Sequence, residues 1–241
     1  MTNLSVNINK IALLRNSRGR DYPNVVNFAK KFIALGADGI TVHPRQDERH
    51  ITMQDAIDLG EHFKDLNGPE LNIEGYPSKD FLSLVEAIKP HQCTLVPDSP
   101  NQLTSDHGWN LKRDMSFVTD SVSRLNKNGI RSALFLDPNL EQVELVAKTG
   151  ADRIELYTEQ FASTFNTSKN DAVFEQYNAA AALAQDLGLG VNAGHDLDLQ
   201  NLPKFLQIQD VLEVSIGHVL TIECIEFGME KVVQSYKKIC E

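Results

Sequence analysis

Short runs of apolar and β-branched residues alternate with longer amphipathic stretches along the whole chain. The runs predict strands at Leu4–Asn9, Gly39–His43, Leu71–Tyr76, Gln92–Val96, Arg131–Asp137, Arg153–Thr158, Leu189–His195 and Glu213–His218. The stretches between them predict helices at Asn24–Leu35, Met53–Lys64, Lys79–Lys89, Leu111–Asn128, Leu140–Thr149, Asp171–Leu187, Leu199–Gln207 and Ile222–Ile239. Strands that alternate with helices indicate βαβ units and a parallel sheet.

Glycines punctuate the predicted junctions between a helix and the next strand. A left-handed C-cap needs a residue without Cβ, and this position is filled by Gly36, Gly129, Gly150 and Gly188. Eight βα units predict a closed (β/α)8 TIM barrel, and the 241 residues suit one such domain over 1–241. The alternative is an open doubly wound sheet, but no G-x-G-x-x-G follows the first predicted strand.

The acidic composition narrows the classes of partner. Lys and Arg number 23 against 33 Asp and Glu, a net charge of −10, which argues against a nucleic acid or an anionic membrane. A few arginines and backbone amides can still bind phosphate. The three cysteines are scattered, the N-terminus has no apolar signal region, and no apolar run approaches the roughly 18 residues of a spanning helix. We therefore expect a cytoplasmic protein with inert thiols.

Polar residues collect where the predicted strands end, which is where barrels of this type place their active sites. These residues are Asn7, Asn9, His43, Arg45, Glu74, Thr104, Asp137, Glu155, Asn192, His195, Gly217 and His218. Each alone has a structural explanation, since a glutamate can neutralise an arginine and an asparagine can hold a loop. Several His and Glu on one face can shift each other's pKa values towards neutrality, so together they predict an acid–base site.

Three segments indicate anion binding. The segment HPRQDERHIT (43–52) carries two arginines and two histidines that can clamp a phosphate; the alternative is a solvated loop neutralised by Asp47 and Glu48. The segments NAGHDL (192–197) and SIGHVL (215–220) place Gly-His after the last two strands, where barrels often bind phosphate. A zinc site is the alternative for the histidines, but their spacing matches no short zinc motif, and we predict no metal.

With these motifs in order, the chain resembles the pyridoxine 5′-phosphate synthase family over nearly its whole length. The resemblance lies in VNINKIALLRNSRG (6–19), GADGITVHPRQDERHIT (36–52), LNIEGY (71–76), VNAGHDL (191–197) and SIGH (215–218). It implies a (β/α)8 barrel that condenses 1-deoxy-D-xylulose 5-phosphate with 3-amino-2-oxopropyl phosphate, without metal or organic cofactor. It also implies dimers assembled into an octamer.

The resemblance further implies a role for each site residue. His43 and Glu74 are expected as proton acceptors, His195 as a proton donor, and Glu155 as a group that stabilises charge in the transition state. The amino-ketone phosphate is expected to bind Asn7, Arg18, Asp196, Gly217 and His218. The deoxyxylulose phosphate is expected to bind Arg45, His50 and Thr104, with Asn9 and Lys10 nearby.

The chain departs from the family pattern in two motifs. Asn7-Ile8-Asn9-Lys10 stands where the family motif has Asn-x-Asp-His, which removes a carboxylate and an imidazole. Asp196 stands where glycine commonly follows the donor histidine, and a carboxylate there would repel phosphate. Because the acid–base residues remain, we interpret both as subfamily variation.

Two other classes of function stay open. Another barrel enzyme acting on phosphorylated sugars, such as an aldolase or epimerase, would share the fold, and an imine-forming aldolase would need a lysine such as Lys10. A non-catalytic phosphate-binding barrel is the other. The long segments Pro97–Gly108 and Glu159–Asn170 are candidate lids over the site.

Overall fold

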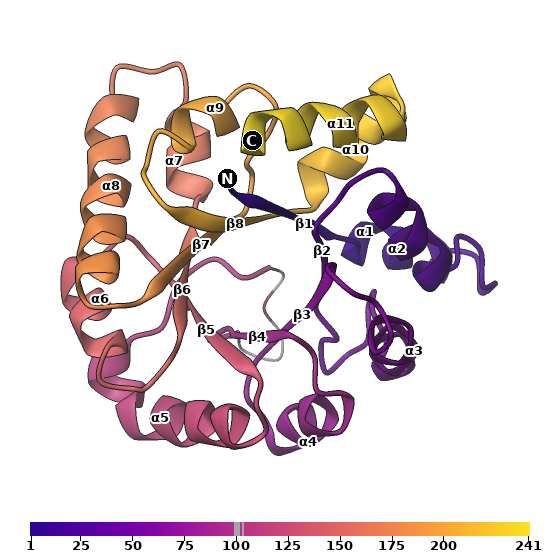
Figure 1. Ribbon diagram of the computed structural model, residues 1–241, viewed down its shortest axis with the longest axis horizontal. Helices are drawn as coiled ribbons and strands as arrows, with labels where there is room; N and C mark the ends of the chain where they lie inside the picture. Colours follow the sequence, from indigo (N-terminus) through magenta and orange to yellow (C-terminus); the bar gives the residue numbers. More distant parts are fainter. Residues whose placement is uncertain (99–101, 103) are drawn as a thin grey trace.

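A computed structural model describes residues 1–98, 102 and 104–241, and within these residues eight parallel strands close into a barrel in chain order (Figure 1). The strands are β1 Asn3–Asn7, β2 Gly39–Val42, β3 Glu70–Gly75, β4 Gln92–Leu95, β5 Arg131–Leu136, β6 Arg153–Tyr157, β7 Gly190–Gly194 and β8 Val211–Ile216. β8 closes the barrel on β1, with Asn3 opposite Glu213 and Val6 opposite Ile216. This confirms the predicted (β/α)8 barrel.

Helices surround the barrel on all sides (Figure 1). They are α1 Asn9–Asn16, α2 Val25–Ala34, α3 Met53–Phe63, α4 Lys79–Ile88, α5 Leu111–Lys127, α6 Leu140–Val146, α7 Glu159–Thr164, α8 Asn170–Asp186, α9 Leu202–Phe205, α10 His218–Phe227 and α11 Met229–Cys240. Local chemistry sets several of their ends. At α3, for example, Thr52 and Asp55 cap each other's backbone amides in a capping box. The four glycines expected at helix ends all have positive φ, from 71° to 107°.

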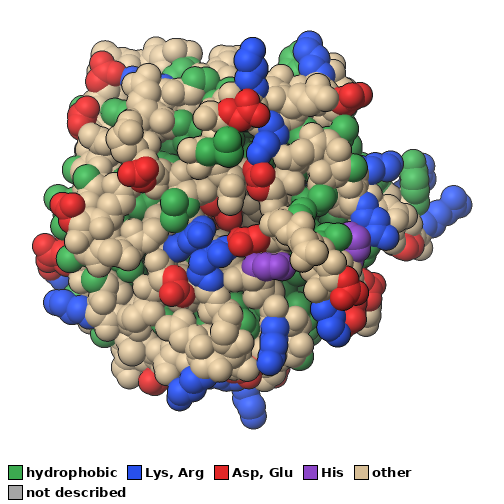
Figure 2. All heavy atoms as spheres, in the orientation of Figure 1, with side chains coloured by type: hydrophobic (Ala, Val, Ile, Leu, Met, Phe, Trp, Pro, Cys, Tyr) green, Lys and Arg blue, Asp and Glu red, His purple; other side chains and the backbone are tan. Residues whose placement is uncertain are grey.

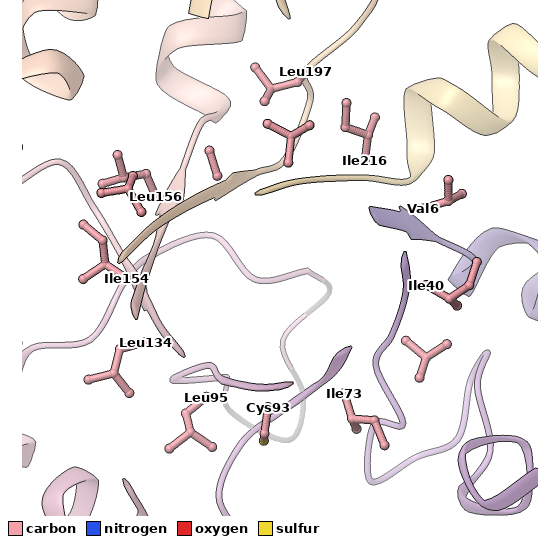
Figure 3. Packing of buried hydrophobic residues seen from close by; sticks show 14 of the residues in the cluster. Val6, Ile40, Ile73, Cys93, Leu95, Leu134, Ile154, Leu156, Leu197 and Ile216 are labelled. Carbon is pink, nitrogen blue, oxygen red and sulfur yellow. The ribbon is translucent and has the colours of Figure 1, made fainter. Parts of the chain in front are cut away.

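The hydrophobic core lies between the strands and the helices rather than inside the barrel. Alternate strand residues such as Val6, Ile40, Ile73 and Leu134 are buried and point away from the barrel axis (Figure 3). There they meet the apolar faces of the helices. Burial of apolar surface, worth about 25 cal/mol per Å², therefore holds the helices onto the outside of the barrel.

The inward residues of the same strands are mostly polar. Ser5 and Thr41 share a hydrogen bond of 2.7 Å, the Asn72 amide donates to Thr41 Oγ1 over 3.4 Å, and Thr94 donates to Asn72 Oδ1 over 3.2 Å. Strands of an ordinary parallel sheet are buried on both faces and read as continuous apolar runs. This barrel instead has a polar lumen, which provides a scaffold for titratable groups.

Several predicted boundaries are wrong, and the differences concern the site. The first strand ends at Asn7, so Asn9 and Lys10 open the unpredicted helix α1. The last strand ends at Ile216, so His218 is the first residue of α10 and not a strand residue. In both places the chain turns into a helix directly beyond the strand, and a polar strand end looks like the polar first turn of a helix in sequence.

Two further corrections concern helices. The helix expected at Ile222–Ile239 is divided into α10 and α11 by Gly228, whose φ of 91° is incompatible with a helix. The helix expected at Leu199–Gln207 is only four residues long. The candidate lid Glu159–Asn170 contains α7, whereas Pro97–Gly108 includes residues 99–101 and 103, which lie outside the described residues. No helix in the described ranges is long and apolar enough to span a bilayer.

Candidate active site

The lumen contains a lower layer of polar side chains at the amino-terminal ends of the strands, which is formed by Glu70, Gln92, Arg131, Arg153, Asn192 and Glu213. Gln92 donates to Glu213 over 3.2 Å and accepts from Arg131 over 3.0 Å and from Asn192 over 3.2 Å. Arg153 donates to Asn192 over 3.1 Å, and Arg131 forms an ion pair with Glu70. The face seen in Figure 2 shows basic and acidic side chains gathered over its middle. Asn192, expected at a strand end, belongs to this layer.

An upper layer of titratable side chains lies towards the other end of the strands and consists of His43, Glu74, Glu155 and His195. His43 follows β2 and is 6% exposed, and Glu155 in the middle of β6 is 2% exposed. His195 contributes to lowering the pKa of His43, and Glu155 contributes to raising the pKa of Glu74, so the members of each pair lie within electrostatic reach of each other. The structure therefore brings together the four residues expected to be catalytic, although Glu155 lies deeper than a strand end.

Burial sets the protonation of these four groups. Desolvation lowers the pKa of His43 well below its usual range, with Arg45 adding to the effect, and it also lowers the pKa of His195. Desolvation raises the pKa of Glu74 well above its usual range, with Glu155 adding to the effect, and raises the pKa of Glu155 to about 7. At neutral pH the imidazoles are therefore neutral, and burial favours the protonated form of both glutamates.

His195 is held in an uncommon backbone conformation. It has a φ of 85°, and the following Asp196 has a φ of 57°. The Thr158 hydroxyl donates to the carbonyl oxygens of His195 and, over 2.6 Å, of Gly194. The imidazole contacts the ring of Tyr157 edge-on, with centroids 5.1 Å apart. The end of β6 and the residue that follows it therefore position both the ring and the backbone of His195.

A chain of asparagines links the strands around Glu74. The side-chain amide of Asn7 donates to Glu74 Oε2 over 3.4 Å, and Asn7 Oδ1 accepts from the backbone N–H of Asn9 over 3.1 Å. Asn9 Oδ1 in turn accepts from the backbone N–H of His43 over 3.0 Å. Asparagine thus supplies the oxygen that this contact needs, as the aspartate of the family motif would. Gly217 lies against Asn7, where an added Cβ would come within 2.9 Å of the Asn7 Cβ.

The segment 43–52 combines both interpretations made from its sequence. Arg45 is 8% exposed, forms an ion pair with Asp98 and donates to the carbonyl of Gln102 over 2.9 Å. His50 lies beside His43, with ring centroids 6.3 Å apart, and burial lowers its pKa to about 4. Arg49 instead pairs with Asp47 over 2.6 Å at the surface. Half of the segment faces the site, and the other half is a neutralised surface loop.

The remaining predicted ligands lie further out. Lys10 is half-buried, and its charge lowers the pKa values of both His50 and His195. Four others are exposed side chains, namely Arg18, Thr104, Asp196 and His218. Among the described residues, no hydrogen bond joins the side chains of these four to the upper layer. They are available to a ligand that approaches the mouth of the barrel.

A cavity of about 320 Å³ opens beside His43. It lies between the loop after β2, the start of α4 and the loop after β4, and its lining includes Arg45, Tyr76, Ser78 and Asp98. The ring of Tyr76 is stacked on Trp109, with centroids 6.2 Å apart. Within the described residues, no group of three or more His, Cys, Asp or Glu side chains is arranged to hold a metal ion.

Sequence reasoning missed Asp98 and most of the lower layer. The signal for the layer was present, because most of the strands alternate between polar and apolar residues, where a buried parallel strand should be apolar throughout. Asp98 gave no such signal. It follows the fourth strand in a loop rich in polar residues, and only its burial against Arg45 distinguishes it.

Comparisons with known proteins show the family and the fold of the chain. A chain from Bacteroides thetaiotaomicron named pyridoxine 5′-phosphate synthase is 51% identical over 238 residues, 98% of each chain, and one from Christiangramia forsetii with the same name is 49% identical over 240 residues, 99% of each. The solved structure of 3-hexulose-6-phosphate synthase from Salmonella typhimurium shares the fold, with a TM-score of 0.67 and 10% identity over 99% of this chain and 98% of that one. The family model described as pyridoxal phosphate biosynthesis protein PdxJ matches residues 4–241. The chain therefore belongs to this family of vitamin B6 biosynthetic enzymes.

Proposed function

We propose that this enzyme condenses 1-deoxy-D-xylulose 5-phosphate with 3-amino-2-oxopropyl phosphate to form pyridoxine 5′-phosphate, releasing inorganic phosphate and water. The observation that carries the proposal is the upper layer: two neutral histidines and two buried glutamates with raised pKa values lie next to a cavity lined by His43 and Arg45. Family membership supports the reaction class. No metal or organic cofactor is part of the proposal.

Imine formation, loss of water and phosphate, and ring closure all require protons to move repeatedly. Neutral His43 accepts a proton from the substrate, and His195 is the proton donor, which gives back a proton that it has taken up in an earlier step. Glu74 holds its proton before substrate binds, so it acts as an acceptor only after passing that proton on. Glu155 is buried and has a pKa of about 7, so near neutral pH it can ionise and stabilise positive charge that develops on the substrate.

Two separate regions bind the two phosphates. Arg45, His50 and Thr104, with Asn9 and Lys10 nearby, hold the deoxyxylulose phosphate on the side of β2 and β4. Asn7, Arg18, Gly217 and His218, with Asp196 beside them, hold the amino-ketone phosphate near the start of α10, whose first backbone amides favour an anion. Binding through remote phosphates positions the reacting carbons. The working form is an octamer built from dimers in the cytoplasm.

The direct test is incubation of the purified protein with both substrates, followed by detection of pyridoxine 5′-phosphate and inorganic phosphate. We expect both products in equal amounts, and none when either substrate is omitted. A folded protein that forms no pyridoxine 5′-phosphate would refute the assignment. Activity that disappears with a chelator and returns with a metal would refute the metal-free mechanism.

A further inference from the structure

Asp98 is a buried carboxylate with one oxygen unused. It follows β4, and its side chain is 4% exposed. Oδ2 accepts hydrogen bonds from Arg45 and, over 2.8 Å, from the Ser105 hydroxyl. Oδ1 is buried and has no hydrogen-bond partner among the described residues. Buried polar atoms in native proteins are almost always paired, so an unpaired one beside a cavity indicates a missing partner.

The position of Asp98 connects it to the reacting groups. It lines the same cavity as His43, Arg45 and Tyr76. The negative charge of Asp98 adds to the raised pKa of Glu74 and partly offsets the lowering of the pKa of His195 by burial. The carboxylate therefore lies within electrostatic reach of two of the groups proposed to move protons. A ligand bound to Arg45 in this cavity therefore also meets Asp98.

The chemistry of the free oxygen selects its partner. An ionised carboxylate only accepts hydrogen bonds and repels phosphate, so Oδ1 needs a donor. Within the described part of the chain, Arg45 donates through two of its five N–H groups, to Asp98 and Gln102, which leaves donors for a phosphate. A ketose phosphate anchored on Arg45 carries its hydroxyl groups a few bonds away from that phosphate.

We propose that Asp98 is a further substrate-binding residue, whose Oδ1 accepts a hydrogen bond from a hydroxyl group of the ketose phosphate bound at Arg45. This inference rests on the proposed function, which supplies the ketose phosphate. Asp98 thus has two roles in binding. Its Oδ2 orients the guanidinium that holds the phosphate, and its Oδ1 favours a ligand whose carbon chain carries hydroxyl groups over one whose chain carries none.

The test compares two ligands on the full-length protein. 1-Deoxy-D-xylulose 5-phosphate carries two hydroxyl groups, whereas 4-oxopentyl phosphate keeps the carbon chain, ketone and phosphate without them. Dissociation constants are measured by calorimetry for the wild type, Asp98→Asn, Asp98→Ala and the control Asp106→Asn. Asp106 is an exposed carboxylate of the same loop, so its replacement makes the same change in net charge.

We expect the wild type and Asp106→Asn to bind the hydroxylated ligand about 10- to 100-fold more tightly than 4-oxopentyl phosphate, the range for a hydrogen bond to a charged group. Asp98→Asn keeps an oxygen for Arg45 but presents a neutral N–H₂ to the hydroxyl group in place of an ionised oxygen, so the discrimination should fall several-fold. Asp98→Ala should lose the discrimination altogether and also bind both ligands more weakly. These results would support the hydroxyl contact.

Three outcomes would overturn it. One is a wild type that does not bind the ketose phosphate or does not discriminate between the ligands, which can be measured whether or not a variant folds. Another is an Asp98→Asn variant that weakens both ligands equally, since Asp98 would then act only through Arg45. The third is an Asp98→Asn variant that discriminates as the wild type does. A wild type that discriminates but forms no pyridoxine 5′-phosphate would refute the proposed function and leave the Asp98 contact standing.

Discussion

The two ends of the barrel lumen both contain buried polar and titratable side chains, but the charges of these side chains are neutralised to different extents. In the lower layer, Arg131 and Arg153 lie among Glu70, Gln92 and Glu213, and side-chain hydrogen bonds connect the set. In the upper layer the buried glutamates have neutral partners, such as Thr94, which donates to Glu155 over 3.0 Å. Arg45, whose charge lowers the pKa of Glu74, is itself paired with Asp98.

This difference suggests a division within the polar lumen, in which the lower layer serves stability and the upper layer serves function. Paired charges in the lower layer satisfy each other and hold the strand ends in register. Burial also raises the pKa of Glu213 in the lower layer, but Arg153 and Arg131 oppose that shift. In the upper layer Glu74 and Glu155 form no ion pair with another described residue, so their raised pKa values cost stability in the free enzyme and become useful when a substrate supplies charge and hydrogen bonds. Three predictions test this division, beginning with the largest expected effect.

Replacement of His195 by asparagine should abolish most turnover without loosening substrate binding. Removal of a positioned acid–base group typically lowers turnover about 10²- to 10⁴-fold. The measurement is steady-state product formation together with the dissociation constant for deoxyxylulose phosphate, which should change less than about threefold because no binding hydrogen bond is assigned to the imidazole. His62→Asn, in the last turn of α3, is the control and should retain activity. Equal losses in affinity and turnover would make His195 a binding residue.

Replacement of Gln92 by leucine should lower the stability of the protein but leave turnover unchanged. It removes one partner each from Glu213, Arg131 and Asn192, and a buried group left unsatisfied costs about 1–3 kcal/mol. We expect a loss of about 3 kcal/mol in the free energy of unfolding, measured by denaturant titration, with turnover per folded molecule unchanged. The exposed Gln209→Leu should change stability by less than about 0.5 kcal/mol. A stable Gln92→Leu protein with low turnover would reverse the division between the layers.

Replacement of Glu155 by glutamine should stabilise the protein at high pH only. The pKa of Glu155 rises from 4.5 to about 7 on folding, so between these values the folded state binds more protons than the unfolded state. The stability of the wild type therefore falls as pH rises through this window. Glutamine can still accept from Thr94 and does not ionise, so its advantage should grow between pH 5 and pH 8 by up to about 3 kcal/mol. A pH-independent difference between the two proteins would show that Glu155 does not titrate there.

Much of the fold was readable in the sequence because each strand carries a strong apolar face. All eight strands occur near their predicted positions, and the glycines mark the helix ends as expected. The catalytic candidates on β2, β3, β6 and β7 also come together, since the carboxyl ends of parallel strands meet at one edge.

The depth of each residue within the lumen could not be predicted. Strands in a barrel are staggered by its shear, so residues at similar positions in their own strands lie at different heights. Asn192 and Glu155 were both expected at strand ends, yet Asn192 joins the lower layer and Glu155 lies in the middle of β6. Asp98 depends on contacts with Arg45 and Ser105, which are 53 and 7 residues away, and no local pattern encodes such a pair.

The left-handed backbone at Asp196 changes what a substitution there means. With a φ of 57°, this position favours glycine, asparagine or aspartate over other residues. Its side chain is exposed, and its carbonyl accepts from the Asn201 amide over 3.1 Å. Exchange between glycine and aspartate therefore keeps the same turn. The residue found at this position in members of the family is therefore limited first by the backbone conformation and only then by contacts with a ligand.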